Sequence, residues 1–276
     1  IYYFDMGKSV GILSLKGGVG KTSTVVALGQ ALADFGKSVL LVDANFSAPN
    51  LGIHLNIINP ETTLHHVLER TANILDAIYV VGKLHVLPAS LFGEEVKNPL
   101  ALKDKLKNLK RKYDYILIDS APALNEESLA ATLASDEAFV VTTPDYPTLS
   151  TTIKAIKAAA QRGTKINGLI LNKVYGKNFE LSLKDIENTA EVPVLAVIPH
   201  DKDFTRALSE FRPYPLVKPN SEGTLEFRKL AATMIGMKYK PFSIKEFFTT
   251  LTPPKQEINR EIFYRQIFNE QQQQNQ

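Results

Sequence analysis

A glycine-rich loop between the first apolar run and the first helical pattern constrains the fold of this chain more than any other feature. The stretch reads SLKGGVGKTS, from Ser14 to Ser23, and holds three glycines within four positions. Glycines allow successive backbone N–H groups to turn toward one centre, where they can bind an anion. A helix that starts directly after the loop adds the partial positive charge of its N-terminus. The stretch therefore predicts a phosphate-binding loop between a buried strand and a helix.

Two side chains at the end of the loop suit a nucleotide. The ammonium group of Lys21 can reach the β- and γ-phosphates, and the hydroxyl of Thr22 can ligate Mg²⁺. The alternative, a glycine-rich turn with incidental lysines, is disfavoured because strand, loop and helix are all in register. Lys16 is unusual, since the common pattern G-x-x-x-x-G-K-[ST] would place a glycine where Leu15 stands and has no need of the lysine that follows.

Short apolar runs alternate with helical patterns along most of the chain. The expected strands are Val10–Ser14, Ser38–Asp43, Leu84–Leu87, Tyr115–Asp119, Ala138–Thr142, Ile166–Leu171 and Val194–Ile198. The expected helices are Thr22–Phe35 and segments near 63–69, 98–112, 125–134, 148–162, 180–190, 201–210 and 222–236. Strands that are apolar on both faces and alternate with helices predict an α/β fold: a doubly wound, mostly parallel sheet with helices on both faces.

The organisation of the chain changes near residue 238. One nucleotide-binding domain is expected over residues 1–237, followed by a helical C-terminal extension over 238–276. The extension has no strand pattern and is interrupted by Pro241, Pro253 and Pro254. Its glutamine-rich end is of low complexity and is expected to be disordered.

Composition excludes several kinds of site. The chain has no cysteine, which excludes disulfides, thiolate metal sites and a cysteine nucleophile, and which fits a reducing compartment. The five histidines show no ligand spacing with acidic residues, so no metal beyond Mg²⁺ is expected. No apolar run approaches the ~18 residues that a membrane-spanning helix needs. A formal net charge of only +3 argues against a strongly basic DNA-binding face.

The loop K-G-G-V-G-K-T, with its additional lysine, is the deviant Walker A motif, and residues 8–237 resemble the MinD/ParA family of P-loop ATPases. In that family the additional lysine reaches the phosphates of the other subunit when two ATP-bound subunits meet face to face. The resemblance therefore implies an ATP-dependent homodimer in which Lys16 acts in catalysis together with Lys21. It implies contacts to the nucleotide from Lys16, Gly17, Gly18, Val19, Gly20, Lys21, Thr22 and Ser23.

Two strand ends resemble the magnesium and switch segments of the family. YDYILIDSAPAL fits the second Walker segment, so Asp119 is expected to hold a water on Mg²⁺. SVLLVDANFSAPNLGIHL fits the first switch, so Asp43 is expected near Mg²⁺, beside Thr22, with a part in catalysis. The family usually carries a second acid two residues later, where this chain has Asn45. An amide can position a water but cannot accept its proton near neutral pH, so slow ATP hydrolysis is expected.

Two further segments resemble the parts of the family that bind the base. LILNKV places Asn172 where the family contacts adenine, and VIPHDKDFTRAL makes Pro199 and Asp201 weaker candidates. Guanine-specific relatives carry an acid two residues after the N-K pair, where Tyr175 stands here, so ATP is expected rather than GTP. The alternative for these residues is an ordinary role at a turn or a helix start.

The function implied by the resemblance is that of a MinD-like ATPase. ATP with Mg²⁺ would close two subunits into a dimer and hydrolysis would release them, so the nucleotide would time the binding of an unidentified partner or activator. Placement of a division site or of another cellular structure is the expected role. One alternative is a ParA-like partition ATPase whose dimer binds DNA non-specifically, which the charge makes the weaker reading. Another is an ATP-gated scaffold in which Asn45 has abolished turnover.

Two short apolar patterns in the extension raise the question of a membrane anchor. The first consists of Ile244, Phe247, Phe248 and Leu251, and the second of Phe263, Tyr264, Ile267 and Phe268 with Arg260 as an interruption. The aromatic residues are expected to pack on the parent domain or on a partner. The alternative is binding to a membrane surface through 243–268. The expected location is the cytoplasm, with the periphery of a membrane as the variant that such an anchor would imply.

Overall fold

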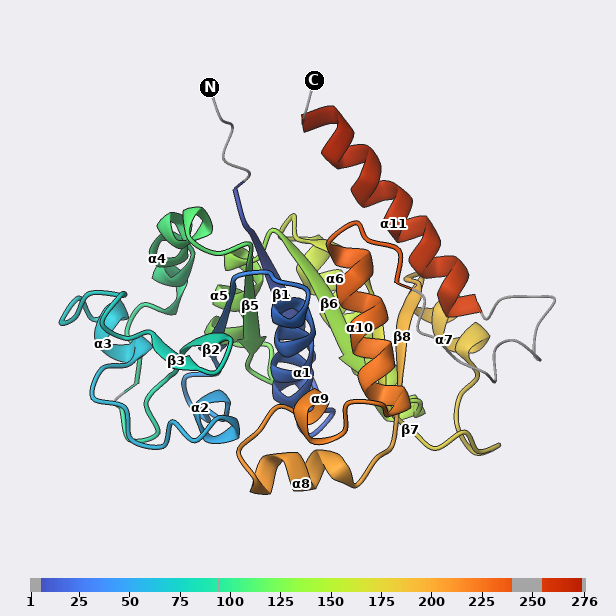
Figure 1. Ribbon diagram of the computed structural model, residues 1–276, viewed down its shortest axis with the longest axis horizontal. Helices are drawn as coiled ribbons and strands as arrows, with labels where there is room; N and C mark the ends of the chain where they lie inside the picture. Colours follow the sequence, from blue (N-terminus) through green and yellow to red (C-terminus); the bar gives the residue numbers. More distant parts are fainter. Residues whose placement is uncertain (1–5, 94, 240–254, 275–276) are drawn as a thin grey trace.

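A computed structural model describes residues 6–93, 95–239 and 255–274 of the chain. Its centre is an eight-stranded sheet of order β3-β4-β2-β5-β1-β6-β7-β8 (Figure 1). Every neighbouring pair of strands is parallel except β3 and β4, which are antiparallel. The predicted class, an α/β fold with a mostly parallel sheet, is confirmed.

The bounds of the elements follow the predicted alternation. The strands are β1 (Lys8–Leu13), β2 (Val39–Ala44), β3 (Tyr79–Val81), β4 (Leu84–Leu87), β5 (Tyr115–Ser120), β6 (Glu137–Thr142), β7 (Lys165–Val174) and β8 (Val194–Pro199). The helices are α1 (Lys21–Asp34), α2 (Leu51–His54), α3 (Leu64–Leu68), α4 (Leu102–Lys107), α5 (Glu126–Ala134), α6 (Tyr146–Ala160), α7 (Leu183–Ala190), α8 (Asp203–Ser209), α9 (Tyr214–Val217), α10 (Glu222–Met234) and α11 (Lys255–Gln274). The sequence patterns did not indicate β3, α2 or α9, which are three or four residues long.

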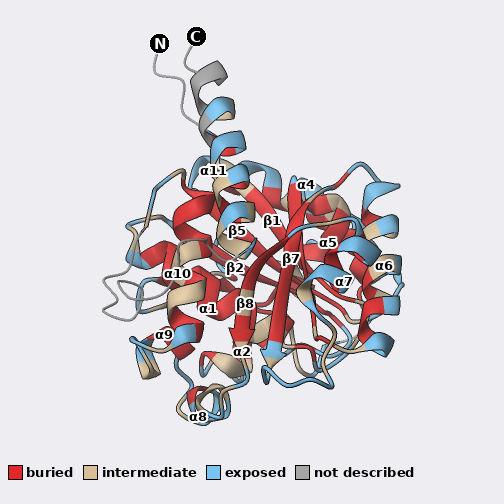
Figure 2. Ribbon diagram, turned by 90° about the vertical axis from the view of Figure 1, so that its right-hand side faces the viewer, coloured by how far each residue is buried: buried red, intermediate tan, exposed pale blue. Residues whose placement is uncertain are grey.

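Helices cover both faces of the sheet because its strands are apolar on both sides. In β2, Leu41 packs with α1 and α10, whereas Leu40 and Val42 pack with α3, α4 and α5 on the opposite face. A third apolar cluster joins α6 and α7 to the latter half of the sheet. Figure 2 shows the buried strands between α1 and α10 on one side and α5 and α6 on the other.

The parallel arrangement brings the carboxyl ends of most strands to one edge of the sheet. β1 lies between β5 and β6, so the glycine-rich loop after β1 meets the ends of its neighbours there. Asp43 of β2 and Asp119 of β5 are direct neighbours in the strand register. This edge, where crossover connections leave in opposite directions, is where α/β sheets bind ligands.

Helix α11 docks on the parent domain, across β8 and α10 (Figure 1). Phe263 and Ile267 are 3% and 2% exposed and belong to the same apolar cluster as α1 and α10. Phe263 and Ile267, two members of the second apolar pattern, therefore pack on the parent domain, as the sequence analysis expected. They are not available to a lipid surface. The stripe of Ile244, Phe247, Phe248 and Leu251 lies outside the described residues.

Arg260, which interrupts the apolar arc in the sequence, lies inside the interface between α11 and the domain. Its Nη1 donates hydrogen bonds of 2.8 Å to Glu226 Oε2 and to the carbonyl of Leu195. The neighbouring Asn259 donates to the carbonyl of Val194 at 3.0 Å. Because β8 is an edge strand, these side chains bind carbonyls that no further strand pairs with.

Helix α11 continues into the glutamine-rich end, as far as Gln274. Glutamine is a good helix former, and extending an existing helix costs less than starting one. Within the part of the chain that the structure describes, no helix combines the length and the apolar character needed to cross a membrane.

Phe263→Ala is expected to lower the free energy of unfolding by about 3 kcal/mol, because truncation of a buried phenylalanine leaves a cavity. Its ring lies edge to face with Phe139, with 6.2 Å between the ring centroids. The matched control is Ile262→Ala on the same helix, since that side chain is 52% exposed. Urea unfolding measures both. Similar losses from the two variants would contradict the docking of α11.

Candidate functional site

The loop between β1 and α1 has the backbone conformation of a phosphate-binding loop. Gly18 and Gly20 have φ angles of 76° and 98°, in the left-handed region that favours glycine. Val19 is only 2% exposed and anchors the loop in the apolar cluster around α1. Helix α1 starts at Lys21, whose side chain is buried, and burial lowers the pKa of its ammonium group despite the neighbouring Asp119. A bound phosphate would give this ammonium group an anionic partner that favours its charged form.

Two side chains at the end of β7 hold the loop in place through hydrogen bonds. Asn172 Nδ2 donates a hydrogen bond of 2.8 Å to the carbonyl of Val19, and Lys173 Nζ donates one of 2.6 Å to the carbonyl of Gly18. A Cβ atom added at Gly20 would lie 2.3 Å from Asn172 Nδ2, far inside van der Waals contact. Glycine at position 20 is thus required both by the backbone angle and by the approach of Asn172.

Gly20→Ala is expected to weaken ATP binding at least ~10-fold, since left-handed strain of roughly 1–2 kcal/mol adds to displacement of Asn172. Gly36→Ala is the matched control. Gly36 also has a positive φ, of 80°, but nothing lies within 4 Å of its added Cβ. It should lose stability and keep its ATP affinity in titration calorimetry. Unchanged affinity in Gly20→Ala would show that the loop tolerates a side chain there.

Thr22, Asp43 and Asp119, the three predicted magnesium residues, come together beside the loop. Thr22 Oγ1 donates a hydrogen bond of 2.6 Å to Asp119 Oδ2. Asp43 Oδ2 accepts from the backbone N–H groups of Asn50 and Leu51 at 3.1 and 3.0 Å. Both carboxyl groups are almost fully buried.

Burial raises the pKa of Asp43 to about 8, and the charge of Asp119 adds to the rise. Burial likewise raises the pKa of Asp119 to about 6, against hydrogen bonding from Thr22 and the charge of Lys21. Asp119 Oδ1 is buried without a hydrogen-bond partner among the described residues. Two mutually repelling carboxyl groups, a hydroxyl and an unpartnered oxygen fit a hard divalent cation that keeps part of its water shell. In the described ranges no cluster of three His, Cys, Asp or Glu residues offers an all-protein metal cage.

Asn45 lies at the same site, and only the nitrogen of its side-chain amide has a hydrogen-bond partner among the described residues. Its Nδ2 donates to the carbonyl of Ala48 at 2.5 Å, and its backbone N–H donates to Asp43 Oδ1 at 3.2 Å. The side-chain oxygen Oδ1 is buried, with no partner among the described residues. This oxygen can accept a hydrogen bond from a water and cannot take its proton.

The side chain of Lys16 contacts residues at the start of α6 in the same chain. Its Nζ lies 3.3 Å from Asp145 Oδ1 and 2.5 Å from Thr148 Oγ1, at the start of α6. Burial works to raise the pKa of Asp145, but hydrogen bonds from Thr143, Thr148 and Lys16 lower it to about 2. Lys16 is therefore paired with an ionised carboxylate, that of the N-cap residue of α6.

A cleft of about 400 Å³ opens beside the loop. The predicted residues that line it are Gly17, Gly18, Gly20, Lys21, Thr22, Ser23, Asn45, Asn172, Pro199 and Asp201. Lys16, Val19, Asp43 and Asp119 do not line it: Val19 and the two acids are buried behind its wall, and Lys16 points to α6. Asp201 already accepts hydrogen bonds from Tyr214 Oη and Lys218 Nζ, at 2.8 and 2.9 Å.

Nine lining residues were not predicted from the sequence, and three of them, His54, Lys173 and His200, carry polar groups that bear on the site. His54 Nδ1 lies 2.9 Å from the carbonyl of Asn50, so Nδ1 carries the proton, and Nε2 lies 3.4 Å from Ser23 Oγ. Lys173 binds the loop, and the ring of His200 stacks on Tyr175 with 4.3 Å between centroids. Lys173 and His200 directly follow Asn172 and Pro199, which was the available signal, whereas nothing in the local pattern pointed to His54.

Comparison with known proteins agrees with this geometry. Residues 7–168 match the family model described as an AAA domain. An uncharacterized ATP-binding protein of Methanocaldococcus jannaschii is 34% identical over 238 residues, covering 85% of this chain and 90% of that protein. The septum site-determining protein MinD of Thermotoga maritima is 32% identical over 84% of this chain and 90% of its own length. The structure of MinD from Pyrococcus horikoshii, complexed with Mg-ADP, is 35% identical with a TM-score of 0.78, over 82% of this chain and 95% of that one.

Proposed function

Because this chain belongs to the MinD/ParA family of P-loop ATPases, we propose that ATP binding closes two copies of it into a symmetric dimer and that hydrolysis reopens the dimer. The position of Lys16 supports this proposal best. Lys21 and Thr22 complete the phosphate site of one subunit, while Lys16 lies outside the cleft against Asp145. A lysine so placed has no phosphate to reach in its own subunit, but it can reach one in a second copy.

ATP and Mg²⁺ are the cofactors of this site. The backbone of the loop and Lys21 would bind the phosphates, and Asn172, Pro199 and Asp201, which line the same cleft, would hold the adenine. Thr22, Asp43 and Asp119 would hold Mg²⁺, directly or through water. When bound, the metal neutralises charge that develops on the phosphates during transfer.

Hydrolysis is proposed to be slow. With Asn45 in place of an acid, the site can orient a water through the free Oδ1 but has no carboxylate at that position to accept its proton. A slow rate would give the ATP-bound dimer a long lifetime, which an activating partner could shorten. The lifetime of the ATP-bound dimer would then set how long a partner stays bound.

The biological role that we propose is spatial positioning, of a division site or of another cellular structure. The relatives named as septum site-determining proteins support this role, and one solved relative, from Aquifex aeolicus, is a complex of MinD with MinC. A ParA-like dimer that binds DNA is the second candidate, and a scaffold without turnover is the third, favoured only by Asn45.

The test is the mass of the protein in solution with ADP, and with ATP and Mg²⁺, followed by phosphate release from the same samples. We expect a monomer with ADP, a dimer with ATP and slow release of phosphate. A dimer without any release would support the scaffold. A monomer under both conditions would overturn the proposal. DNA added to the ATP form separates the remaining candidates, because non-specific DNA binding weakens steeply with salt.

A further inference from the structure

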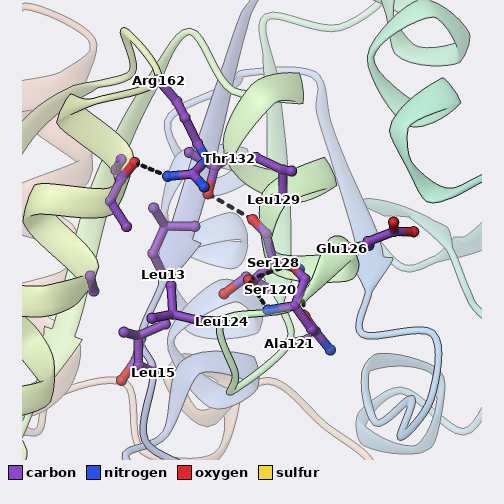
Figure 3. A pocket seen from close by; sticks show the side chains of 15 residues that line it. Leu13, Leu15, Ser120, Ala121, Leu124, Glu126, Ser128, Leu129, Thr132 and Arg162 are labelled. Atoms are coloured by element: carbon purple, nitrogen blue, oxygen red, sulfur yellow. Dashed lines mark hydrogen bonds between the residues drawn. The ribbon is translucent and has the colours of Figure 1, made fainter.

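A second pocket, separate from the nucleotide cleft, lies between α5 and α6, on the face of the sheet opposite α1 (Figure 3). Its volume is about 330 Å³. The ends of β1 and β5 form its inner wall, through Leu13 to Leu15 and through Ser120 and Ala121. Lys16 directly follows the first of these segments, and Asp119 directly precedes the second.

The pocket is open because α6 presents only small side chains to it. Ala155, Ala158 and Ala159 are the α6 residues that line it, with no large side chain to fill the space. The facing elements contribute leucines, of which Leu124 is 62% exposed. The result is an apolar cavity large enough for a small organic molecule.

Two polar groups of this pocket have hydrogen-bonding capacity to spare. Ser120 is 2% exposed, and its Oγ has no hydrogen-bond partner among the described residues. Arg162 donates one hydrogen bond, of 2.8 Å, from Nη1 to the carbonyl of Ala158. No described carboxylate lies within 4.0 Å of its guanidinium group. Arg162 stands at one end of the pocket and Leu15 at the other (Figure 3).

Most of the remaining polar side chains of the pocket are hydrogen-bonded within the protein, and Glu126, the one carboxylate that lines it, points away from Leu13 and Arg162 (Figure 3). Asn125 and Ser128 cap the start of α5 through reciprocal hydrogen bonds. Thr132 Oγ1 donates to the carbonyl of Ser128 at 2.7 Å. A ligand would therefore find one cation at one end and one buried hydroxyl without a partner, between walls of apolar side chains and of polar side chains that, apart from Glu126, are already hydrogen-bonded.

We propose that this pocket binds a small amphipathic carboxylate. The anionic group would pair with Arg162, the apolar body would lie against the leucines and alanines, and a polar atom of the ligand would hydrogen-bond to Ser120. A buried hydroxyl without a partner is costly, so a ligand that satisfies it gains affinity. The charge of Arg162 selects an anion over a neutral molecule of the same shape.

The ligand would contact both segments that carry the nucleotide chemistry. Leu13 to Leu15 lead into the phosphate-binding loop, and Ser120 lines the nucleotide cleft as well as this pocket. Binding would therefore restrain the loop of Lys16 and the segment after Asp119 together. ATP turnover is expected to change when the pocket is filled, with no contact between ligand and nucleotide.

The experiment titrates the full chain, without nucleotide, with octanoate and with 8-hydroxyoctanoate, and follows backbone amide signals by NMR. We expect saturable shifts at residues of the pocket, with dissociation constants on the order of 1 mM, as befits about ten heavy atoms. The hydroxylated probe should bind more tightly than octanoate. Because nucleotide is absent, the outcome is independent of ATP-dependent dimerisation.

Three variants make this experiment decisive. Arg162→Gln should weaken binding at least ~5-fold, and Ala158→Leu should abolish it by filling the pocket, with folding checked by thermal melting. Lys154→Gln removes an exposed cation of α6 that does not line the pocket. This variant should bind the probes as tightly as the parent chain does. Absence of saturable shifts at 10 mM probe, or equal affinity in Arg162→Gln, would overturn the proposal. In that case a side chain of a protein partner becomes the better occupant.

Discussion

A Lys16→Ala variant is expected to bind ATP with Mg²⁺ and to remain a monomer at concentrations where the parent chain is a dimer. The phosphate site of each subunit is left intact, since Lys21 and Thr22 are unchanged. What is lost is a buried charge pair between Lys16 and a phosphate across each half of the dimer. Loss of one such pair costs roughly 2–5 kcal/mol, and a symmetric dimer loses two, so its affinity should fall by three orders of magnitude or more.

Analytical ultracentrifugation in ATP measures this effect, with titration calorimetry to confirm that ATP still binds. Asp145→Asn is the matched variant, because it removes the charge that holds Lys16 in its own subunit. Asparagine remains a good N-cap for α6, so the helix should stay intact. This variant should dimerise at least as well as the parent chain. A dimer in Lys16→Ala as stable as that of the parent would show that Lys16 does not act across the interface.

The second large effect is expected from Asn45→Asp, which should raise the rate of ATP hydrolysis roughly 10²-fold. The substitution places a carboxylate where the unpartnered amide oxygen now lies. Burial beside Asp43 and Asp119 would raise the pKa of that carboxyl toward neutrality, and a general base works best when its pKa lies near the working pH. The amide of Asn45 can only orient the attacking water.

Single-turnover phosphate release measures this rate, with ATP affinity determined separately. Asn50→Asp is the matched control: Asn50 lines the same cleft, and its Nδ2 also donates to the carbonyl of Ala48, at 2.8 Å. Asn50→Asp should not accelerate ATP hydrolysis, because the side chain at position 50 is exposed and points to the backbone of Ala48. Equal rates in the parent chain and Asn45→Asp would mean that position 45 is not the catalytic one. Turnover in the variant alone would identify the parent as a scaffold.

The sequence predicted the parts of the site that depend on local patterns. Apolar strands ending in Asp43 and Asp119, and glycines between a strand and a helix, are recognisable in short windows, and parallel pairing then brings them to one edge. Strand β3 was missed because three residues, partly exposed, carry no measurable periodicity. The four-residue helices α2 and α9 escaped for the same reason.

Contacts between distant positions could not be predicted from patterns. Lys16 and its partner Asp145 are 129 positions apart, and Asn172 is 153 positions from the loop carbonyl that it binds. Arg260 was taken as a break in an apolar arc because a helical wheel treats every charge as facing water. In the fold it faces Glu226 and a backbone carbonyl inside the interface, which only the tertiary arrangement reveals.

The docking of α11 has a consequence for biosynthesis. A ribosome delivers β8 well before α11, so for part of translation the sheet is assembled while its last edge is uncovered. During that interval the carbonyls of Val194 and Leu195 lack the side-chain donors from α11, and Glu226 lacks Arg260. During this stage the exposed edge of β8 can accept a strand from a neighbouring chain, an association that chaperones prevent. The stage ends when α11 has left the ribosome and covers β8.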